Sequence, residues 1–360
     1  MEVIQKKELC IVHIGMPKTG SSTIEENLFL GIDDARVRYA NLGVVNHGEP
    51  IVSFYVDNPS SFYYLSGLSA DDIFAKNQKN MDLLINSFVA IGNQIEIISG
   101  ETFFHLPDIC RKNNGLEKFK SLLDRFFSKV VVVAYVRKPS DFLPSSFQQR
   151  VKYHNTKTLN HAEFYHRYIN LKKFIEVFGT ENVHLWNFDP KQFPDGDILL
   201  DFTTRLGLQP QRSKIKVVNE SITKEAISIL FTYHFHENGK TDFGVRQNNL
   251  SFQLVELFRK IGSEKFKFSG QFIQRAIAAN QEDYEWIVRV MGEDFKETPE
   301  SLSAEGVDNE HELMHYATQF IPNLVELAGD FAKDLKLDDT PQTVARLVDK
   351  IMLRLAHDHR

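Results

Sequence analysis

A short loop between a buried strand and a helix is the feature that most constrains this chain. The loop reads Ile14-Gly15-Met16-Pro17-Lys18-Thr19-Gly20-Ser21-Ser22-Thr23. The apolar run at 9–14 predicts a strand before it, and the pattern at 23–29 predicts a helix after it. In such a unit, loop amides and the positive end of the helix dipole bind an anion. Lys18 adds a positive charge and the hydroxyls add donors, so the sequence predicts a phosphate cradle.

The loop departs from the Walker A pattern of nucleoside triphosphatases in the position of its lysine. That pattern has a glycine, four residues, and then Gly-Lys-Ser/Thr. Gly15 and Gly20 have this spacing, but Ser21 stands where the lysine is required, and the lysine is at position 18. A strand–helix turn with an incidental lysine is the alternative. The glycine, lysine and hydroxyl spacings together favour an anion site.

Composition limits the classes of partner. The chain has 360 residues, of which 42% are hydrophobic and 25% charged, as in a globular protein with a large core. A net charge of −6 without a basic block argues against nucleic acid as a partner. Cys10 and Cys110 form no CxxC pair, so neither a zinc site nor a disulfide framework is implied. The N-terminus lacks a signal-type segment, and the aliphatic run 130–134 is too short to span a bilayer. We therefore expect a cytoplasmic protein without a transmembrane segment.

Apolar runs and helical patterns alternate through the first half of the chain. Strands are predicted at 94–99, 129–136 and 181–188, and helices at 71–92, 116–127, 140–154 and 161–178. This alternation predicts an α/β fold of three layers with a central, mostly parallel sheet. Ligands bind at the carboxyl ends of the strands in such sheets. Glu101 and Arg137 follow the strands at 94–99 and 129–136, so we expect them on the same rim as the loop.

The remainder of the chain is predicted to be a helical C-terminal extension, with helices at 223–236, 250–261, 271–291, 311–336 and 343–357. We expect residues 1–215 to form the α/β core with the anion site and 216–295 to continue it with helices. Residues 296–360 would be an acidic linker and C-terminal helices of unknown role. The aromatic-rich segment 33–69 is expected to form part of an acceptor site.

Two motifs resemble those of sulfotransferases that use 3′-phosphoadenylyl sulfate (PAPS). Pro-Lys-Thr-Gly-Ser-Ser-Thr at 17–23 resembles the loop that binds the 5′-phosphosulfate. Arg137 at a strand end, with Ser145 eight residues later, resembles the motif that binds the 3′-phosphate. Pro144 is unusual inside a helix, so the helix would begin or bend there, and Ser146 is an alternative to Ser145. The resemblance covers roughly residues 8–222.

The resemblance implies PAPS as donor, its desulfated form (PAP) as product, and no metal. The donor-binding residues would be Gly15, Pro17, Lys18, Thr19, Gly20, Ser21, Ser22, Thr23, Arg137 and Ser145. Sulfuryl transfer to an alcohol needs a cation near the leaving oxygen and a base near the acceptor hydroxyl. Lys18 would be the cation and Glu101 the base. His105 is the second candidate for the base, because cytosolic members carry a Thr-His-Leu-Pro stretch near this position.

The expected function is transfer of a sulfuryl group to a hydroxyl or amine of an acceptor. A carbohydrate or glycolipid is favoured, because the aromatic residues at 39–64 would stack on sugars, although core packing explains them equally well. A kinase or nucleoside triphosphatase is a second candidate, but its comparable strand ends in a metal-binding aspartate, and here it ends at Arg137. A non-catalytic nucleotide-binding protein is the third, and it predicts PAP binding without turnover.

Overall fold

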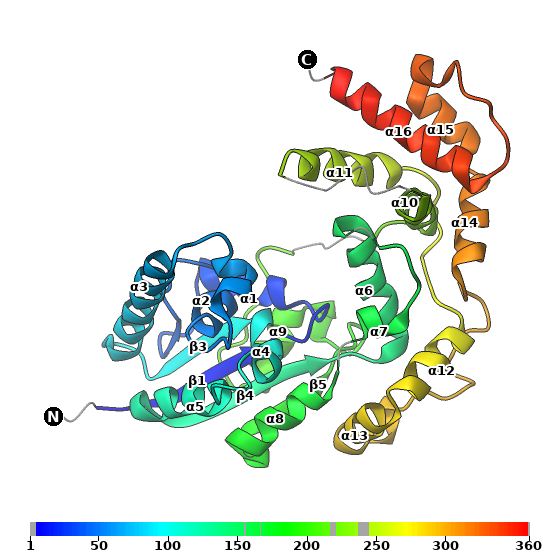
Figure 1. Ribbon diagram of the computed structural model, residues 1–360. Coiled ribbons are helices and arrows are strands. Elements are labelled where there is room, and N and C mark those ends of the chain that lie inside the picture. Colours follow the sequence, from blue (N-terminus) through cyan, green and yellow to red (C-terminus); the bar gives the residue numbers. More distant parts are fainter. Residues whose placement is uncertain (1–4, 155, 166, 217–220, 237–244, 359–360) are drawn as a thin grey trace. The chain divides into compact units, whose positions relative to one another are not determined.

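In the computed structural model, the predicted strands form one parallel sheet of five strands with the order β2-β3-β1-β4-β5 (Figure 1). The strands are β1 (Lys7–Ile14), β2 (Val37–Tyr39), β3 (Ile95–Gly100), β4 (Phe127–Val136) and β5 (Val183–Asn187). The structure describes residues 5–154, 156–165, 167–216, 221–236 and 245–358. The predicted α/β class with a parallel sheet is confirmed.

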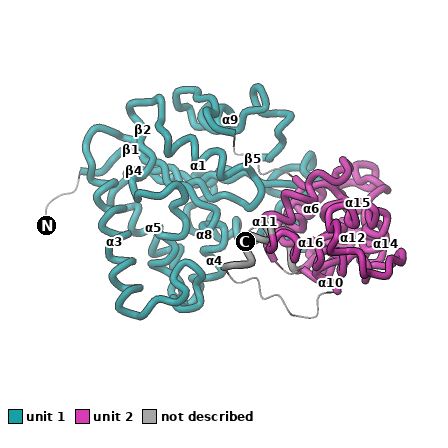
Figure 2. The backbone as a smooth tube through the Cα atoms, turned by 90° about the horizontal axis from the view of Figure 1, so that it is seen from above, with its two compact units in different colours: residues 1–138, 166–218, 282–296 teal, residues 139–165, 219–281, 297–360 magenta. Residues whose placement is uncertain are grey.

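The chain divides into two compact units, each made of three segments (Figure 2). Unit 1 comprises residues 1–138, 166–218 and 282–296, and it contains the sheet. Unit 2 comprises residues 139–165, 219–281 and 297–360, and it is helical. The division into segments 1–215, 216–295 and 296–360 stays a prediction.

Helices cover both faces of the sheet in unit 1. They are α1 (Ser21–Leu30), α2 (Gly48–Val52), α3 (Ala70–Val89), α4 (Leu106–Ile109), α5 (Gly115–Phe126), α8 (Ile169–Phe178), α9 (Ile198–Arg205) and nearly all of α13 (Gln281–Met291). On one face, Ile24 of α1 and Phe202 of α9 share a core with Ile11 and Val133 of the strands. On the other, α5 and α8 pack against β4 (Figure 2). The predicted three layers are thereby present.

Residues 37–39 form a strand that the sequence analysis missed, because three residues are too few to show an alternating pattern. The aromatic-rich segment around β2 also contains α2 and the 3₁₀ turns η1 (Pro59–Ser61) and η2 (Tyr63–Leu65). Its backbone is fastened to β3, since the Ala40 amide donates to the Ile97 carbonyl and the His47 amide to the Ser99 carbonyl, both at 2.9 Å. The segment is therefore joined to the sheet of unit 1 by backbone hydrogen bonds.

Three predicted helices are each divided in two, because a break of a few residues hardly disturbs apolar spacing. The pattern at 161–178 gives α7 (His161–Phe164) and α8, and the pattern at 271–291 gives α12 (Gly270–Ala279) and α13. The pattern at 311–336 gives α14 (Glu310–Thr318) and α15 (Ile321–Ala328), with a proline in the first turn of α15. The other helices of unit 2 are α6 (Pro139–Tyr153), α10 (Lys224–His236), α11 (Val245–Phe258) and α16 (Pro341–Asp358).

Unit 2 has its own aromatic core. The Phe147 ring of α6 lies 5.9 Å from Phe231 of α10 and 5.3 Å from Phe266, centroid to centroid. Phe268 and Phe272 are stacked at 4.0 Å in the same unit. Helix α10 is buried along most of its length and contacts α14 and α16. These contacts make unit 2 a packed body in its own right.

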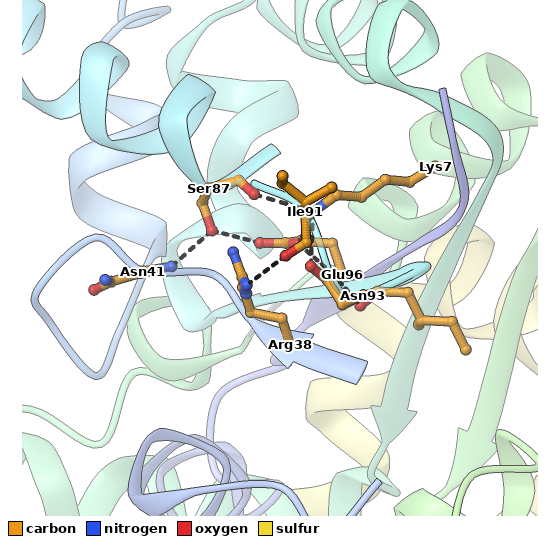
Figure 3. Close-up of polar contacts among 8 residues, drawn as sticks. Lys7, Arg38, Asn41, Ser87, Ile91, Asn93 and Glu96 are labelled. Carbon is orange, nitrogen blue, oxygen red and sulfur yellow. Dashed lines mark hydrogen bonds and ion pairs between the residues drawn. The ribbon is translucent and has the colours of Figure 1, made fainter. Parts of the chain in front are cut away.

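A buried ion pair holds the amino-terminal edge of the sheet (Figure 3). The Lys7 ammonium donates to Glu96 Oε2 at 2.8 Å, to Asn93 Oδ1 at 3.1 Å and to the Ser87 carbonyl at 3.0 Å. Glu96 also accepts from Ser87 Oγ at 2.5 Å and from Asn93 Nδ2 at 2.9 Å. Both charges therefore have several hydrogen-bond partners, and the group ties β1, β3 and α3 together far from the rim that carries the loop.

Replacing Lys7 with methionine should cost about 3–5 kcal/mol of unfolding free energy, because Glu96 would keep a buried charge without its cation. Denaturant unfolding measures this loss. Lys6→Met, at an exposed neighbouring position, is the matched control and should change stability by less than about 0.5 kcal/mol. A Lys7→Met/Glu96→Leu variant should recover much of the loss, and equal stability of Lys7→Met and wild type would contradict this account.

Candidate functional site

Parallel pairing brings the ends of the three central strands together. Strand β1 lies between β3 and β4, with Ile14 opposite Gly100 and His13 opposite Val133. The loop predicted to bind an anion follows β1, and Glu101 follows β3 directly. Arg137 follows the last residue of β4. The expectation that these groups share one rim is confirmed by the register of the strands.

The backbone of the loop needs its glycines. Gly20 has φ +73°, and a Cβ there would lie 2.8 Å from the Ile198 side chain. A Cβ on Gly15 would lie 2.8 Å from the Ser21 Cβ and 3.4 Å from the Glu101 Cα. Helix α1 begins at Ser21, and Gly20 before it has no side chain to cap the helix. Its first-turn amides therefore face the loop without a capping side chain, as an anion site requires.

Lys18 also occupies the left-handed region, with φ +67°, which is uncommon for a residue with a side chain. The Arg137 guanidinium supports this turn, because its Nη1 donates to the Lys18 carbonyl at 2.9 Å. The neighbouring Thr19 uses its hydroxyl internally, donating to the Met16 carbonyl at 2.6 Å. Thr19 can thus offer a ligand only its backbone amide, whereas Lys18 keeps its ammonium for other contacts.

Opposite charges meet where the loop approaches the end of β3. Burial lowers the pKa of the Lys18 ammonium, the Glu101 carboxylate opposes that shift, and the Arg137 charge adds to it. Burial raises the pKa of Glu101, and the Lys18 charge opposes that shift. Lys18 and Glu101 are thus electrostatic neighbours, and Arg137 places a second positive charge near Lys18. The structure brings together a cation pair and a carboxylate with a raised pKa.

Two further carboxylates act on the same region. Burial and the Glu49 carboxylate raise the pKa of Glu101. Burial together with the carboxylates of Glu101 and Glu49 also raises the pKa of Glu25. Glu49 reaches this place because α2 docks on the end of β3, where the Gly48 nitrogen lies 2.3 Å from the position of a Cβ on Gly100. Only glycine allows so close an approach. Tyr63, an exposed residue of η2, donates its hydroxyl to Glu49 Oε1 at 2.5 Å.

A chain of buried polar groups lies beneath the loop. His13 Nδ1 is 2.7 Å from Ser99 Oγ, which donates to Glu25 Oε1 at 3.1 Å. His13 and Ser99 are fully buried and Glu25 is 3% exposed. Burial lowers the pKa of His13 to about 3, so its ring is neutral. Burial raises the pKa of Glu25 to about 7, with the Ser99 hydrogen bond opposing and the nearby carboxylates adding to the shift.

The remaining predicted site residues have different surroundings. His105 ends the 3₁₀ turn η3 (Glu101–His105); burial lowers its pKa and Asp108 opposes the shift. Ser145 is half-buried and Ser146 is buried, both on α6 of unit 2. The helix begins at Pro139, which confirms the start predicted near 140, and contains Pro144, so the alternative start near Pro144 is wrong and a bend there stays a prediction. The role of Ser145 or Ser146 in holding a phosphate stays a prediction.

Sequence reasoning missed Glu25, Glu49, Ser99 and His13. The sequence held a signal for Glu49, because Asn46-His47-Gly48 precedes it. A glycine such as Gly48 allows another backbone segment to approach closely. The neighbouring His47 is buried; its Nδ1 accepts from the Ser99 amide at 3.3 Å, and its ring lies 4.2 Å from that of Tyr39. No sequence pattern marks the pairing of His13 with Ser99, because it depends on the register of β1 and β3.

Neither the rim nor any other described part of the chain contains three or more His, Cys, Asp or Glu side chains grouped to hold a metal ion. In the same described ranges, every helix is too short or too polar to cross a membrane.

Comparisons with known proteins give one sequence relative and several structural neighbours. No protein-family model matches the chain. An uncharacterized protein of Archaeoglobus fulgidus is 25% identical over 187 residues, which are 49% of this chain and 50% of that protein. The chain thus spans about half the length of the curated relative it matches.

Three solved structures similar to this chain are sulfotransferases. The Alicyclobacillus acidocaldarius sulfotransferase has a TM-score of 0.36 and 13% identity, covering 64% of this chain and 93% of its own. The sulfotransferase domain of the Synechococcus PCC 7002 olefin synthase has a TM-score of 0.32 and 12% identity, covering 78% and 96%. The sulfotransferase domain from the curacin biosynthetic pathway has a TM-score of 0.31 and 12% identity, covering 77% of this chain and 99% of its own.

Replacing Glu25 with glutamine should make the protein more stable at high pH. The pKa of Glu25 is about 7 in the folded state against 4.5 as its ordinary value, so the folded state binds more protons between these values. Wild-type stability therefore falls as pH rises through this window. Glu25→Gln removes that fall and should be roughly 1–3 kcal/mol more stable near pH 8, and equal to wild type near pH 4.

Unfolding curves at the two pH values measure this difference. Glu117→Gln, at an exposed position of α5 on the other face of the sheet from α1, is the control and should leave the fall in stability caused by Glu25 in place. If Glu25→Gln and wild type kept a constant difference at both pH values, a raised pKa of Glu25 would be ruled out.

Proposed function

We propose that this chain is a sulfotransferase that moves a sulfuryl group from PAPS to a hydroxyl or amine of an acceptor. The observation that carries the proposal is the position of Lys18. The backbone of Lys18 is left-handed, and its carbonyl accepts a hydrogen bond from Arg137. The Lys18 ammonium interacts electrostatically with the Glu101 carboxylate. A phosphosulfate on the loop would meet a cation on one side and a base on the other.

The loop residues have separate tasks in this proposal. Backbone N–H groups of the loop, among them those of Ser21 and Ser22, and the hydroxyls of Ser21, Ser22 and Thr23 would bind the 5′-phosphosulfate at the start of α1. Lys18 would stabilise the negative charge that develops on the bridging oxygen as the sulfur–oxygen bond breaks. Arg137 would hold the 3′-phosphate and would keep the Lys18 turn in place through its hydrogen bond to the carbonyl.

Glu101 would act as the base. The acceptor hydroxyl loses its proton to the Glu101 carboxylate as its oxygen bonds to sulfur, and PAP leaves. A base works best when its pKa is close to the operating pH, and burial together with Glu49 raises the pKa of Glu101 in that direction. His105 remains the alternative base. The carbohydrate or glycolipid acceptor and the cytoplasmic location are further parts of the proposal.

Arg137 also distinguishes the proposal from a kinase or nucleoside triphosphatase. In those enzymes, an aspartate at the comparable strand end holds Mg²⁺ beside the phosphates. A guanidinium that donates to the loop itself would repel a metal ion there and attract a phosphate. A non-catalytic protein that binds PAP is the remaining alternative, and only turnover distinguishes it.

Calorimetric titration with PAP in the absence of metal tests the donor site. We expect micromolar binding, weakened about 100-fold or more by Lys18→Ala and by Arg137→Ala, since each removes a charge-assisted contact. Arg212→Ala, which removes an exposed arginine, is the matched control and should bind like wild type. Binding of ATP only with Mg²⁺, unaffected by Arg137→Ala, would overturn the proposal in favour of a kinase.

The rate of PAP release from PAPS, measured with a panel of carbohydrate, glycolipid and amine acceptors, tests the base. Glu101→Gln should slow transfer by about 10²–10⁴-fold without weakening PAP binding, since the charge it removes is negative like that of the nucleotide. His105→Gln should slow it little. The opposite ranking would transfer the role to His105, and binding of PAP without turnover on any acceptor would favour the non-catalytic alternative.

A further inference from the structure

Glu25 is a buried carboxyl group directly behind the proposed donor loop. It lies on α1, the helix that begins at the loop, and is 3% exposed. Its Oε1 accepts from Ser99 Oγ, and Ser99 lies on β3 two residues before Glu101. The group is thus connected to both elements that form the site, through a hydrogen bond on one side and through its own helix on the other.

The charges around Glu25 are of its own sign. Glu101, Glu26 and Glu49 each raise its pKa, and burial raises it further. By contrast, Glu96 at the other end of the sheet has Lys7 within 2.8 Å. A buried carboxylate among carboxylates is unfavourable, and a proton is the simplest means of removing its charge.

The hydrogen bonding around Glu25 accommodates either protonation state. A serine hydroxyl can donate to a carboxylate or accept from a carboxylic acid. Ser99 Oγ lies between Glu25 Oε1, at 3.1 Å, and His13 Nδ1, at 2.7 Å. Neutral imidazole can likewise be donor or acceptor at that nitrogen. Neither state of Glu25 therefore leaves the Ser99 hydroxyl without a partner.

We propose that Glu25 is a proton-linked positioning residue: binding of the donor nucleotide on the loop is accompanied by uptake of one proton from solvent by the Glu25 carboxylate. The inference rests on the proposed function, since it requires the nucleotide to occupy the loop. An incoming anion adds negative charge near a group that already faces carboxylates. Protonation of Glu25 removes one of those charges and leaves Glu101 ionised to act as base.

The other titratable groups facing Glu25 are poor substitutes for this role. His13 on β1 is buried, with its pKa lowered to about 3, and burial raises the pKa of Tyr39 on β2, so both are neutral at neutral pH. Glu49 on α2 accepts from the exposed Tyr63. Glu101 on η3 has the Lys18 charge beside it, which favours its ionised form. For Glu25, the charges with the largest effects on its pKa are those of carboxylates.

Calorimetric titration with PAP in buffers of different ionisation enthalpy counts the protons taken up. For wild type near pH 8 we expect uptake approaching about one proton per PAP, and near pH 5.5 almost none, because Glu25 is then already protonated. The phosphates of PAP are fully ionised near pH 8, so they contribute little there. Glu25→Gln should abolish the uptake and bind PAP about tenfold more tightly near pH 8, with equal affinity near pH 5.5.

Glu117→Gln, at an exposed position of α5 on the other face of the sheet from α1, is the control and should retain the uptake. Infrared difference spectra of wild type with and without PAP give a second readout that needs no variant: a carboxylic acid band should appear on binding near pH 8. Proton uptake that is absent from wild type, or unchanged in Glu25→Gln, would overturn the inference. Failure of PAP to bind at all would instead overturn the proposed function, so the two failures are distinguishable.

Discussion

The hydrogen bonding of β1 on both sides is the interaction on which the site depends. Because β3 and β4 pair with β1 in parallel, their carboxyl ends reach the same rim, with Ile14 opposite Gly100. The loop after β1 then meets the residue after β3, and the glycines at 15 and 100 let the backbones of neighbouring segments approach closely. Lys18, Glu101 and Arg137 become neighbours through backbone pairing, although 119 residues separate the first from the last.

Unit 1 neutralises its buried carboxylates in two different ways at the two ends of its sheet. At the amino-terminal edge, Glu96 has a lysine and two neutral donors, a complete set of partners that keeps the group rigid. At the rim, the buried Glu25 and the half-buried Glu101 lie near one another, and Lys18 offsets the charge of Glu101. The first arrangement suits stability. The second costs stability, and such costs are typical of sites whose charge changes with a ligand.

Several parts of the site were predictable because they depend on local sequence and one rule of topology. The loop at 15–23 has its own signature, and long apolar runs identified four of the five strands. The rule that ligands bind at carboxyl ends of parallel strands then selected Glu101 and Arg137. Strand β2 and the docking of α2 were not predictable, since three residues show no period and the Gly48–Gly100 approach joins segments far apart in sequence.

The sequence by itself determined the parallel α/β architecture and the glycine-containing loop with its displaced lysine, because each depends on spacing along a few neighbouring residues. The tertiary structure decided the electrostatics of the site. Whether a carboxylate is buried, and whether a lysine, a serine or another carboxylate faces it, depends on strand register and helix packing. Glu25 and Glu96 are chemically identical in the sequence. In the structure, Glu25 has carboxylates and Ser99 as neighbours, whereas Glu96 is paired with Lys7, and only the fold determines these neighbours.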